Sequence, residues 1–134
     1  MTTIYAGLDI AKANLQLHLN GQFHDLPNSP AGHRRLIELL ATQERVHVIC
    51  EATGGYERDV VAALHQAAIA VSVLNPARVR HFARAQGQRA KTDRMDAAVL
   101  SAYGGSLQPK ATAARTKLEQ QLAELVRRRL QLLE

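Results

Sequence analysis

Residues 4–10, Ile4-Tyr5-Ala6-Gly7-Leu8-Asp9-Ile10, form a short apolar run that carries one carboxylate near its end. Side chains alternate between the two faces of a strand, so Asp9 shares its face with Tyr5 and Gly7. An isolated carboxylate in apolar surroundings is costly unless it is paired or bound to a metal ion. The run therefore predicts the first strand of the fold, with a chemically important acid at its end.

The next residues predict an antiparallel sheet. Leu15-Gln16-Leu17-His18-Leu19 alternates strictly between apolar and polar residues, a pattern typical of a half-buried strand. Asn20-Gly21 is a strong hairpin turn signal, and residues 22–26 return as the next strand. Three antiparallel strands are therefore expected to open the domain.

From residue 29 onward the pattern changes to helices that alternate with strands. Ser29 is a candidate N-cap for a helix with Pro30 at its first position. Residues 46–50 are a continuous apolar run, suited to the centre of a covered sheet, and Glu51 comes directly after them. The other elements are expected as helices over residues 30–42, about 56–68 and from 76 onward, and as a parallel strand over residues 70–74.

A second acidic motif, Lys91-Thr92-Asp93-Arg94-Met95-Asp96-Ala97, opens an Ala/Leu-rich run that should be helical to about Gly104-Gly105. Asp93 and Asp96 would share one helix face, with Cβ atoms about 5–6 Å apart. Acids are also common in a first helical turn, where they favour the helix dipole. The surrounding basic residues favour a metal ion on one side and a polyanion on the other. They are Arg78, Arg80, Arg84, Arg89, Lys91 and Arg94.

Composition limits the class of protein. The 134 residues allow one domain and little more, and the net charge of +5 is uneven: −2 over residues 1–75 and +7 over residues 76–134. This asymmetry indicates a second half that faces a polyanion. One cysteine excludes an intramolecular disulfide, and no apolar run is long enough for a membrane span. A soluble protein of the reducing cytoplasm is expected, with no membrane partner.

Residues 112–134 predict an amphipathic helix. Leu118, Leu122 and Leu125 begin an apolar stripe that continues toward the last residue, although Arg129 interrupts it. The helix resembles the start of a coiled coil, and it should pack on its own domain or on a second copy of the chain. A chain that stops inside a helix also looks like a fragment of a longer protein.

The element order, three antiparallel strands and then alternating helices and parallel strands, is that of a ribonuclease H-like α/β domain with a mixed five-stranded sheet. In that architecture the first and fourth strands are central neighbours, which would place Asp9 beside Glu51. The next helix could bring Asp93 and Asp96 to the same edge. Four carboxylates suit Mg²⁺ or Mn²⁺, and two such ions stabilise both the attacking and the leaving oxygen in phosphoryl transfer.

Four motifs resemble a known family. They are Gly7-Leu8-Asp9-Ile10-Ala11-Lys12, Cys50-Glu51-Ala52-Thr53-Gly54-Gly55-Tyr56, Asn75-Pro76 and the acidic motif at residues 91–97. In this order they are similar to the N-terminal domain of DEDD-type insertion-sequence transposases, a family that includes the Piv pilin-gene invertases. The resemblance covers roughly residues 3–105, and the coiled-coil-like tail resembles the segment that comes after this domain in family members.

The resemblance implies a RuvC-like catalytic domain over residues 1–107, with Asp9, Glu51, Asp93 and Asp96 as the metal-binding tetrad. It implies a bacterial or archaeal DNA recombinase that cleaves and transfers strands, and some family members are guided by a structured noncoding RNA. Family members also have a C-terminal domain that supplies a serine nucleophile, and this chain stops before it. Complete recombination by this chain alone is therefore not expected.

Several residues near the acids are expected to contact DNA phosphates. Backbone N–H groups at the helix start after Gly54-Gly55 could hold a phosphate oxygen, although glycines are also common in an ordinary strand-to-helix turn. The basic segment supplies the positive charge. The expected nucleic-acid contacts are Lys12, Thr53, Gly54, Arg78, Arg80, Arg84, Arg89, Lys91 and Arg94.

Other interpretations are weaker. The motif at residues 7–12 also resembles the first phosphate loop of actin-like ATPases and sugar kinases, which need a second Gly-rich loop that this chain lacks. A catalytically silent nucleic-acid-binding and oligomerisation module is the more serious alternative. Zinc binding by His47 and Cys50 is disfavoured because alternation puts the two side chains on opposite faces, and Cys50 is expected in the core. Ser101 has no base near it in sequence, so it is not expected to be a nucleophile.

Overall fold

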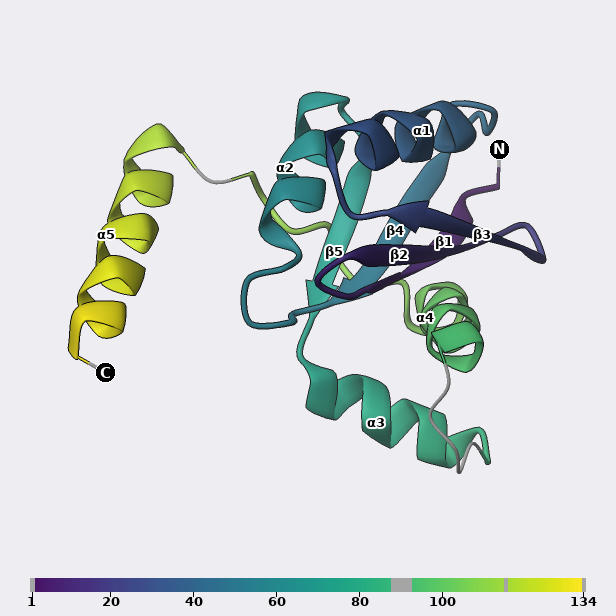
Figure 1. The fold of residues 1–134 in the computed structure, drawn as a ribbon. Helices are drawn as coiled ribbons and strands as arrows, with labels where there is room; N and C mark the ends of the chain where they lie inside the picture. Colours follow the sequence, from purple (N-terminus) through teal and green to yellow (C-terminus); the bar gives the residue numbers. More distant parts are fainter. Residues whose placement is uncertain (1, 88–92, 115, 134) are drawn as a thin grey trace.

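The structure, a computed structural model, describes residues 2–87, 93–114 and 116–133, except for the side chains of residues 93–95, 117, 120 and 133. It contains five strands and five helices within these ranges (Figure 1). The strands are β1 (Ile4–Ile10), β2 (Asn14–Leu19), β3 (Gln22–Pro27), β4 (Val46–Glu51) and β5 (Ala70–Leu74). The helices are α1 (Pro30–Leu40), α2 (Arg58–Gln66), α3 (Pro76–Ala85), α4 (Asp93–Leu107) and α5 (Lys117–Leu133).

The strands form one mixed sheet in the order β3-β2-β1-β4-β5. β1 pairs antiparallel with β2, with Gly7 opposite His18, and parallel with β4, with Gly7 level with Ile49. This confirms the predicted five-stranded sheet and places β1 and β4 at its centre. The turn between β2 and β3 has positive φ at both Asn20 (53°) and Gly21 (80°), the backbone of the hairpin turn that Asn-Gly favours.

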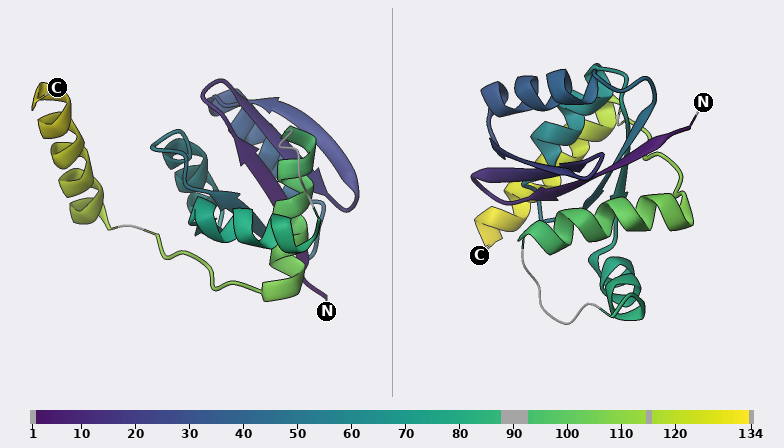
Figure 2. Two further views of the ribbon diagram at one scale, coloured as in Figure 1. Left: turned by 90° about the horizontal axis from the view of Figure 1, so that it is seen from below. Right: turned by 90° about the vertical axis from the view of Figure 1, so that its right-hand side faces the viewer.

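Helices cover both faces of the sheet (Figures 1 and 2). α1 and α2 lie on one face, where Leu8, Leu17 and Val48 are fully buried in the larger core. α4 lies across the other face, with α3 beyond it, and these two helices bury a smaller core around Ile49 and Leu100. Strand alternation produces the two cores because successive side chains of β1 and β4 enter opposite layers.

Two helix boundaries differ from the predictions. α2 begins at Arg58, later than expected, because Gly54 (φ 84°) and Gly55 (φ 130°) form a turn that precedes the helix. α4 continues through Gly104 and Gly105 to Leu107. Gly104 is a contact residue and does not end the helix: a Cβ there would lie 2.7 Å from side-chain atoms of Tyr5 and Ile49. The helix therefore ends two residues beyond the predicted end near Gly104-Gly105.

Residues 110–112 are attached to the free edge of β5. The Thr112 N–H donates to Val71 O at 2.8 Å, and the Val73 N–H donates to Thr112 Oγ1 at 3.0 Å. Ser72 Oγ donates to Lys110 O at 2.7 Å. We call residues 110–112 the edge strap. It protects an otherwise open strand edge and fixes the chain before α5.

α5 begins at Lys117 and lies apart from the sheet in Figure 1. Its apolar stripe is exposed, with Leu118, Leu122 and Leu125 at 64%, 53% and 59%. The amphipathic character predicted for this segment is confirmed, whereas coiled-coil formation stays a prediction. Within the described part of the chain, no helix has the length and apolar character needed to cross a membrane.

Candidate active site at the ends of β1 and β4

Asp9 and Glu51 come from neighbouring strands that point in the same direction. The register between β1 and β4 pairs Gly7 with Ile49, and continuing it by two residues brings Asp9 level with Glu51. Adjacent strands lie about 4.8 Å apart. Both carboxylates are half-buried. The fold therefore brings these two acids to one edge, where the carboxyl ends of the central strands meet.

Helix α4 begins near the same edge. Gly7 lies against the backbone of Ala97 and Ser101, and Gly104 lies against Tyr5, so α4 runs antiparallel to β1. Asp93 is the first residue of α4, and its side chain lies outside the described residues.

Asp96, which is half-buried, lies one helical turn before the buried Leu100. The backbone thus directs the start of α4 toward the end of β1.

The residues at this edge show how well it fits a metal ion. Among the described side chains, which do not include that of Asp93, no three His, Cys, Asp or Glu residues lie close enough to hold a metal ion. Gln16, which is 8% exposed and opposite Asp9 on β2, donates from Nε2 to Asp25 Oδ1 at 2.6 Å. Its Oε1 is buried with no hydrogen-bond partner. An unpartnered buried oxygen beside a carboxylate fits a hard cation or its bound water.

Asn28 connects the two loops that come after β1 and β4. Its Nδ2 donates to Ala11 O at 2.9 Å and to Tyr56 O at 3.2 Å. Its Oδ1 lies 2.7 Å from His33 Nε2. Asn28 therefore holds together the loops that flank Asp9 and Glu51. This residue was not predicted from the sequence, because its only local signal is a place in a turn before a helix.

In the turn after Glu51, the carboxylate of Glu57 accepts hydrogen bonds from the turn's own donors. The Thr53 hydroxyl donates to Glu57 Oε2 at 2.7 Å, and the Gly55 N–H donates to the same oxygen at 3.0 Å. Burial acts to raise the pKa of Glu57, but these hydrogen bonds hold it below its ordinary value. The carboxylate thus satisfies groups that were expected to face a phosphate. Gly54 remains exposed, as does Lys12 in the loop after β1.

Helix α3, which carries the described part of the basic segment, lies beside α4. Arg78, Arg80 and Arg84 are exposed on α3, a helix that carries no acidic residue. Phe82 of this helix packs edge-on against Tyr103 of α4, with ring centroids 5.3 Å apart. Arg89 and Lys91 lie outside the described residues, and so does the side chain of Arg94. Of the six basic contacts predicted between residues 78 and 94, three can therefore be placed, all on one helix next to α4.

Ser101 has a histidine near it in space. Its Oγ lies 2.8 Å from His18 Nδ1, and burial lowers the pKa of His18. The same Oγ accepts the Gly7 N–H at 2.7 Å and donates to His18 O at 3.2 Å. These contacts place Ser101 as an anchor that ties α4 to the β1–β2 pair.

His47 and Cys50 point to opposite sides of β4. His47 lies against the Tyr5 ring, with centroids 5.4 Å apart, and its Nε2 lies 2.7 Å from Ser72 Oγ. Cys50 is fully buried in the larger core, as predicted, and burial raises its pKa to about 12. The two residues do not share a site.

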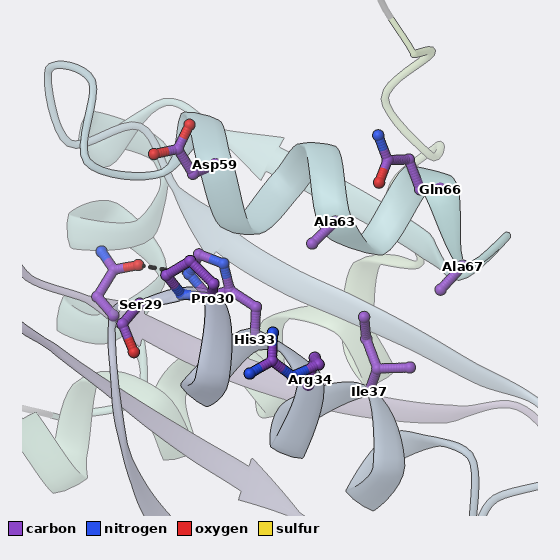
Figure 3. Close-up of a pocket in the computed structure, with 10 residues that line it drawn as sticks. Ser29, Pro30, His33, Arg34, Ile37, Asp59, Ala63, Gln66 and Ala67 are labelled. Atoms are coloured by element: carbon purple, nitrogen blue, oxygen red, sulfur yellow. Dashed lines mark hydrogen bonds between the residues drawn. The ribbon is translucent and has the colours of Figure 1, made fainter.

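A hollow of about 490 Å³ lies between α1 and α2, on the face of the sheet opposite α4 (Figure 3). His33 and Arg34 of α1 and Asp59 and Gln66 of α2 are among its lining residues. None of the ten lining residues is a predicted site residue. The hollow therefore contains none of the candidate acids, although Asn28, which holds the loops beside them, is among its lining residues.

Comparisons with known proteins agree with this architecture. A family model described as a transposase matches residues 6–134. The pilin gene-inverting proteins of Moraxella lacunata and Moraxella bovis are each 28% identical over 137 residues, which is 96% of this chain and 42% of theirs. This chain thus spans less than half the length of these relatives.

Among solved structures, the chain is similar to T. thermophilus RuvC in complex with a Holliday junction substrate. The TM-score is 0.60 at 15% identity, covering 82% of this chain and 99% of RuvC. A second Thermus thermophilus RuvC structure gives a TM-score of 0.56 at 15% identity, over 80% and 98% of the two chains. At this identity the likeness shows the fold alone, and it confirms the predicted ribonuclease H-like, RuvC-like class.

Proposed function

The chain belongs to the DEDD-type IS110 transposase family, and on that premise we propose that it is the metal-dependent RuvC-like domain of a DNA transposase or site-specific recombinase. The observation that carries the proposal is the meeting of β1, β4 and the start of α4 at one edge. Asp9 and Glu51 are level there, and α4 begins with Asp93. This chain spans 42% of the length of the pilin gene-inverting protein, so the activity of the whole protein is part of the proposal.

In this proposal Asp9, Glu51, Asp93 and Asp96 hold two Mg²⁺ or Mn²⁺ ions. Such ions, when bound, stabilise the attacking and leaving oxygens of a phosphodiester during strand cleavage and transfer. The fourth proposed ligand is Asp93, whose side chain lies outside the described residues. The buried amide oxygen of Gln16 would then contact the ion or a water molecule bound to it.

The DNA backbone is proposed to cross the face formed by α3 and the start of α4. Arg78, Arg80 and Arg84 would contact phosphates there, together with Arg89, Lys91 and Arg94 of the next segment. Lys12, Thr53 and Gly54 would approach the same strand from the loops beyond β1 and β4. Of these, the Thr53 hydroxyl cannot donate to a phosphate oxygen while its proton is directed at Glu57. A structured RNA guide, as in some family members, is a further proposed partner.

A second candidate function is a catalytically silent nucleic-acid-binding and oligomerisation module. Two observations favour it: the described acids do not assemble a metal-binding group, and α5 exposes an apolar stripe. In either function we propose self-association through α5, because a contiguous exposed apolar stripe tends to be covered by a partner. The two candidates differ in one property, which is divalent-metal binding at Asp9.

The nucleic-acid face is tested by salt-dependent binding to a four-way DNA junction, measured by fluorescence anisotropy. Each lost phosphate contact lowers the slope of log K against log salt by about 0.9. Changing Arg78, Arg80 and Arg84 together to Ala should therefore reduce the slope by up to about 3. The matched control removes the same charge from α5 by changing Arg127, Arg128 and Arg129 to Ala. Equal slopes in wild type and the α3 variant would mean that α3 is only a solvated surface.

A further inference from the structure

Helix α4 touches β1 backbone to backbone. A Cβ added to Gly7 would collide with Ala97 O and would lie 2.8 Å from Ser101 N. At the other end of the contact, a Cβ on Gly104 would lie 2.9 Å from Tyr5 Cβ. The approach is this close because the strand has a glycine where the helix crosses it. Such a contact holds the helix near the strand, but a row of small residues does not by itself fix how far along the strand the helix sits.

One hydroxyl supplies that missing constraint. Ser101 Oγ accepts the Gly7 N–H at 2.7 Å and donates to His18 O at 3.2 Å, and Gly7 is directly opposite His18 in the β1–β2 pair. The hydroxyl therefore bridges the donor and the acceptor of one residue pair of the sheet. In the tautomer that protonates Nδ1, His18 adds a third hydrogen bond to the same oxygen at 2.8 Å. Displacing α4 along β1 would break all of these contacts.

Ser101 lies on the face of α4 that continues toward the acids at the start of the helix. Ser101 and Ala97 are one turn apart, and helical position 93 is one turn further toward the start of α4. Four helical residues rise about 6 Å, and two strand residues about 6.7 Å. A step from position 97 to 93 along α4 therefore matches a step from Gly7 to Asp9 along β1. The anchored register brings the first residue of α4 to the level of Asp9.

We propose that Ser101 is a positioning residue that fixes the axial register of α4 on β1, and thereby sets the distance between the acids of α4 and Asp9. The inference rests on the proposed metal site for its consequence, but the register itself is a property of the apoprotein. A displacement by one helical residue moves the α4 acids by about 1.5 Å. Metal–ligand distances tolerate only about 0.2 Å, so such a displacement separates the ligands.

The first measurement is Mn²⁺ affinity of the full chain by titration calorimetry, at a temperature where every variant is folded. Ser101→Ala should weaken Mn²⁺ binding by about 10- to 100-fold, the usual effect of removing a group that orients metal ligands. The matched control is Ser106→Ala, the same change at an exposed position of the same helix. It should keep the wild-type affinity. Wild-type affinity in Ser101→Ala would overturn the proposal.

The second measurement reports the position of α4 along β1 in the absence of metal. Spin labels on cysteines introduced at Ala13, after β1, and at Gly105, near the end of α4, report a distance along the β1 axis. Both positions are exposed, and the native Cys50 is buried. Ser101→Ala should shift or broaden the distance distribution, and Ser106→Ala should not. An unchanged distribution overturns the positioning role whatever the metal result. Absence of Mn²⁺ binding by the wild type refutes the metal site alone, and the label distances still decide the role of Ser101.

Discussion

Gly7→Ala should destabilise the protein, although alanine is ordinarily the better residue in regular structure. The added Cβ would meet two backbone atoms of α4, Ala97 O and Ser101 N, neither of which can rotate away. The helix must therefore move off the sheet. Overpacking of this kind costs typically 1–3 kcal/mol, and the lower backbone entropy of alanine offsets about 0.5–1 kcal/mol of that. We expect a net loss of about 1–2 kcal/mol in the free energy of unfolding.

Gly105→Ala provides the matched control, because it makes the same chemical change in α4 where nothing lies within 4 Å of the new Cβ. There the entropy gain stands alone, and stability should rise by about 0.5–1 kcal/mol. Urea denaturation monitored by circular dichroism measures both variants. The midpoints should move in opposite directions with unchanged m-values. A Gly7→Ala protein as stable as the wild type would refute the backbone contact between β1 and α4.

Three further outcomes are expected. Glu57→Gln should lower stability at neutral pH and lose this effect in acid. The depressed pKa of Glu57 contributes stability that is present above the ordinary glutamate pKa and disappears as the pH falls through the pKa of the folded protein. A difference in urea midpoints that does not change with pH would contradict this reasoning. Cys50 should resist a thiol reagent at pH 8 in the folded protein, because burial raises its pKa to about 12, and rapid labelling without unfolding would be inconsistent with that burial. A chain ending at Ala114, which keeps Thr112 on β5, should sediment as a monomer while the full chain associates through α5. Two monomers in this comparison would exclude association through α5.

The strands and their order along the chain could be predicted because they depend on local patterns. Alternation at residues 15–19, the Asn20-Gly21 turn and the continuous apolar run before Glu51 each act over a few residues. They predicted the strands in chain order, and the ribonuclease H-like architecture that this order indicates has its first and fourth strands side by side. The observed pairing of β1 with β4 confirms that neighbourhood, which brings the two candidate acids Asp9 and Glu51 to one edge.

The features that could not be predicted depend on contacts between distant segments. Gly104 was expected to end a helix, but it is a position where α4 meets Tyr5. Ser101 had no base near it in sequence, yet His18, 83 residues away, lies beside it. Asn28 holds two loops that no local pattern brings together. A single sequence shows which residues are small or polar, but their partners become visible only in three dimensions.

The main proposal is that the edge formed by β1, β4 and α4 binds a divalent metal, and titration of the full chain with Mn²⁺ by calorimetry is its decisive test. Wild type should bind Mn²⁺, and Asp9→Asn should lower the affinity at least about tenfold, because it removes one charged ligand. Asp59→Asn, the same change at an exposed position of α2 on the other face, should bind like the wild type. Equal affinity of Asp9→Asn and wild type would contradict the proposed site, and no binding by any of the three would favour the catalytically silent module.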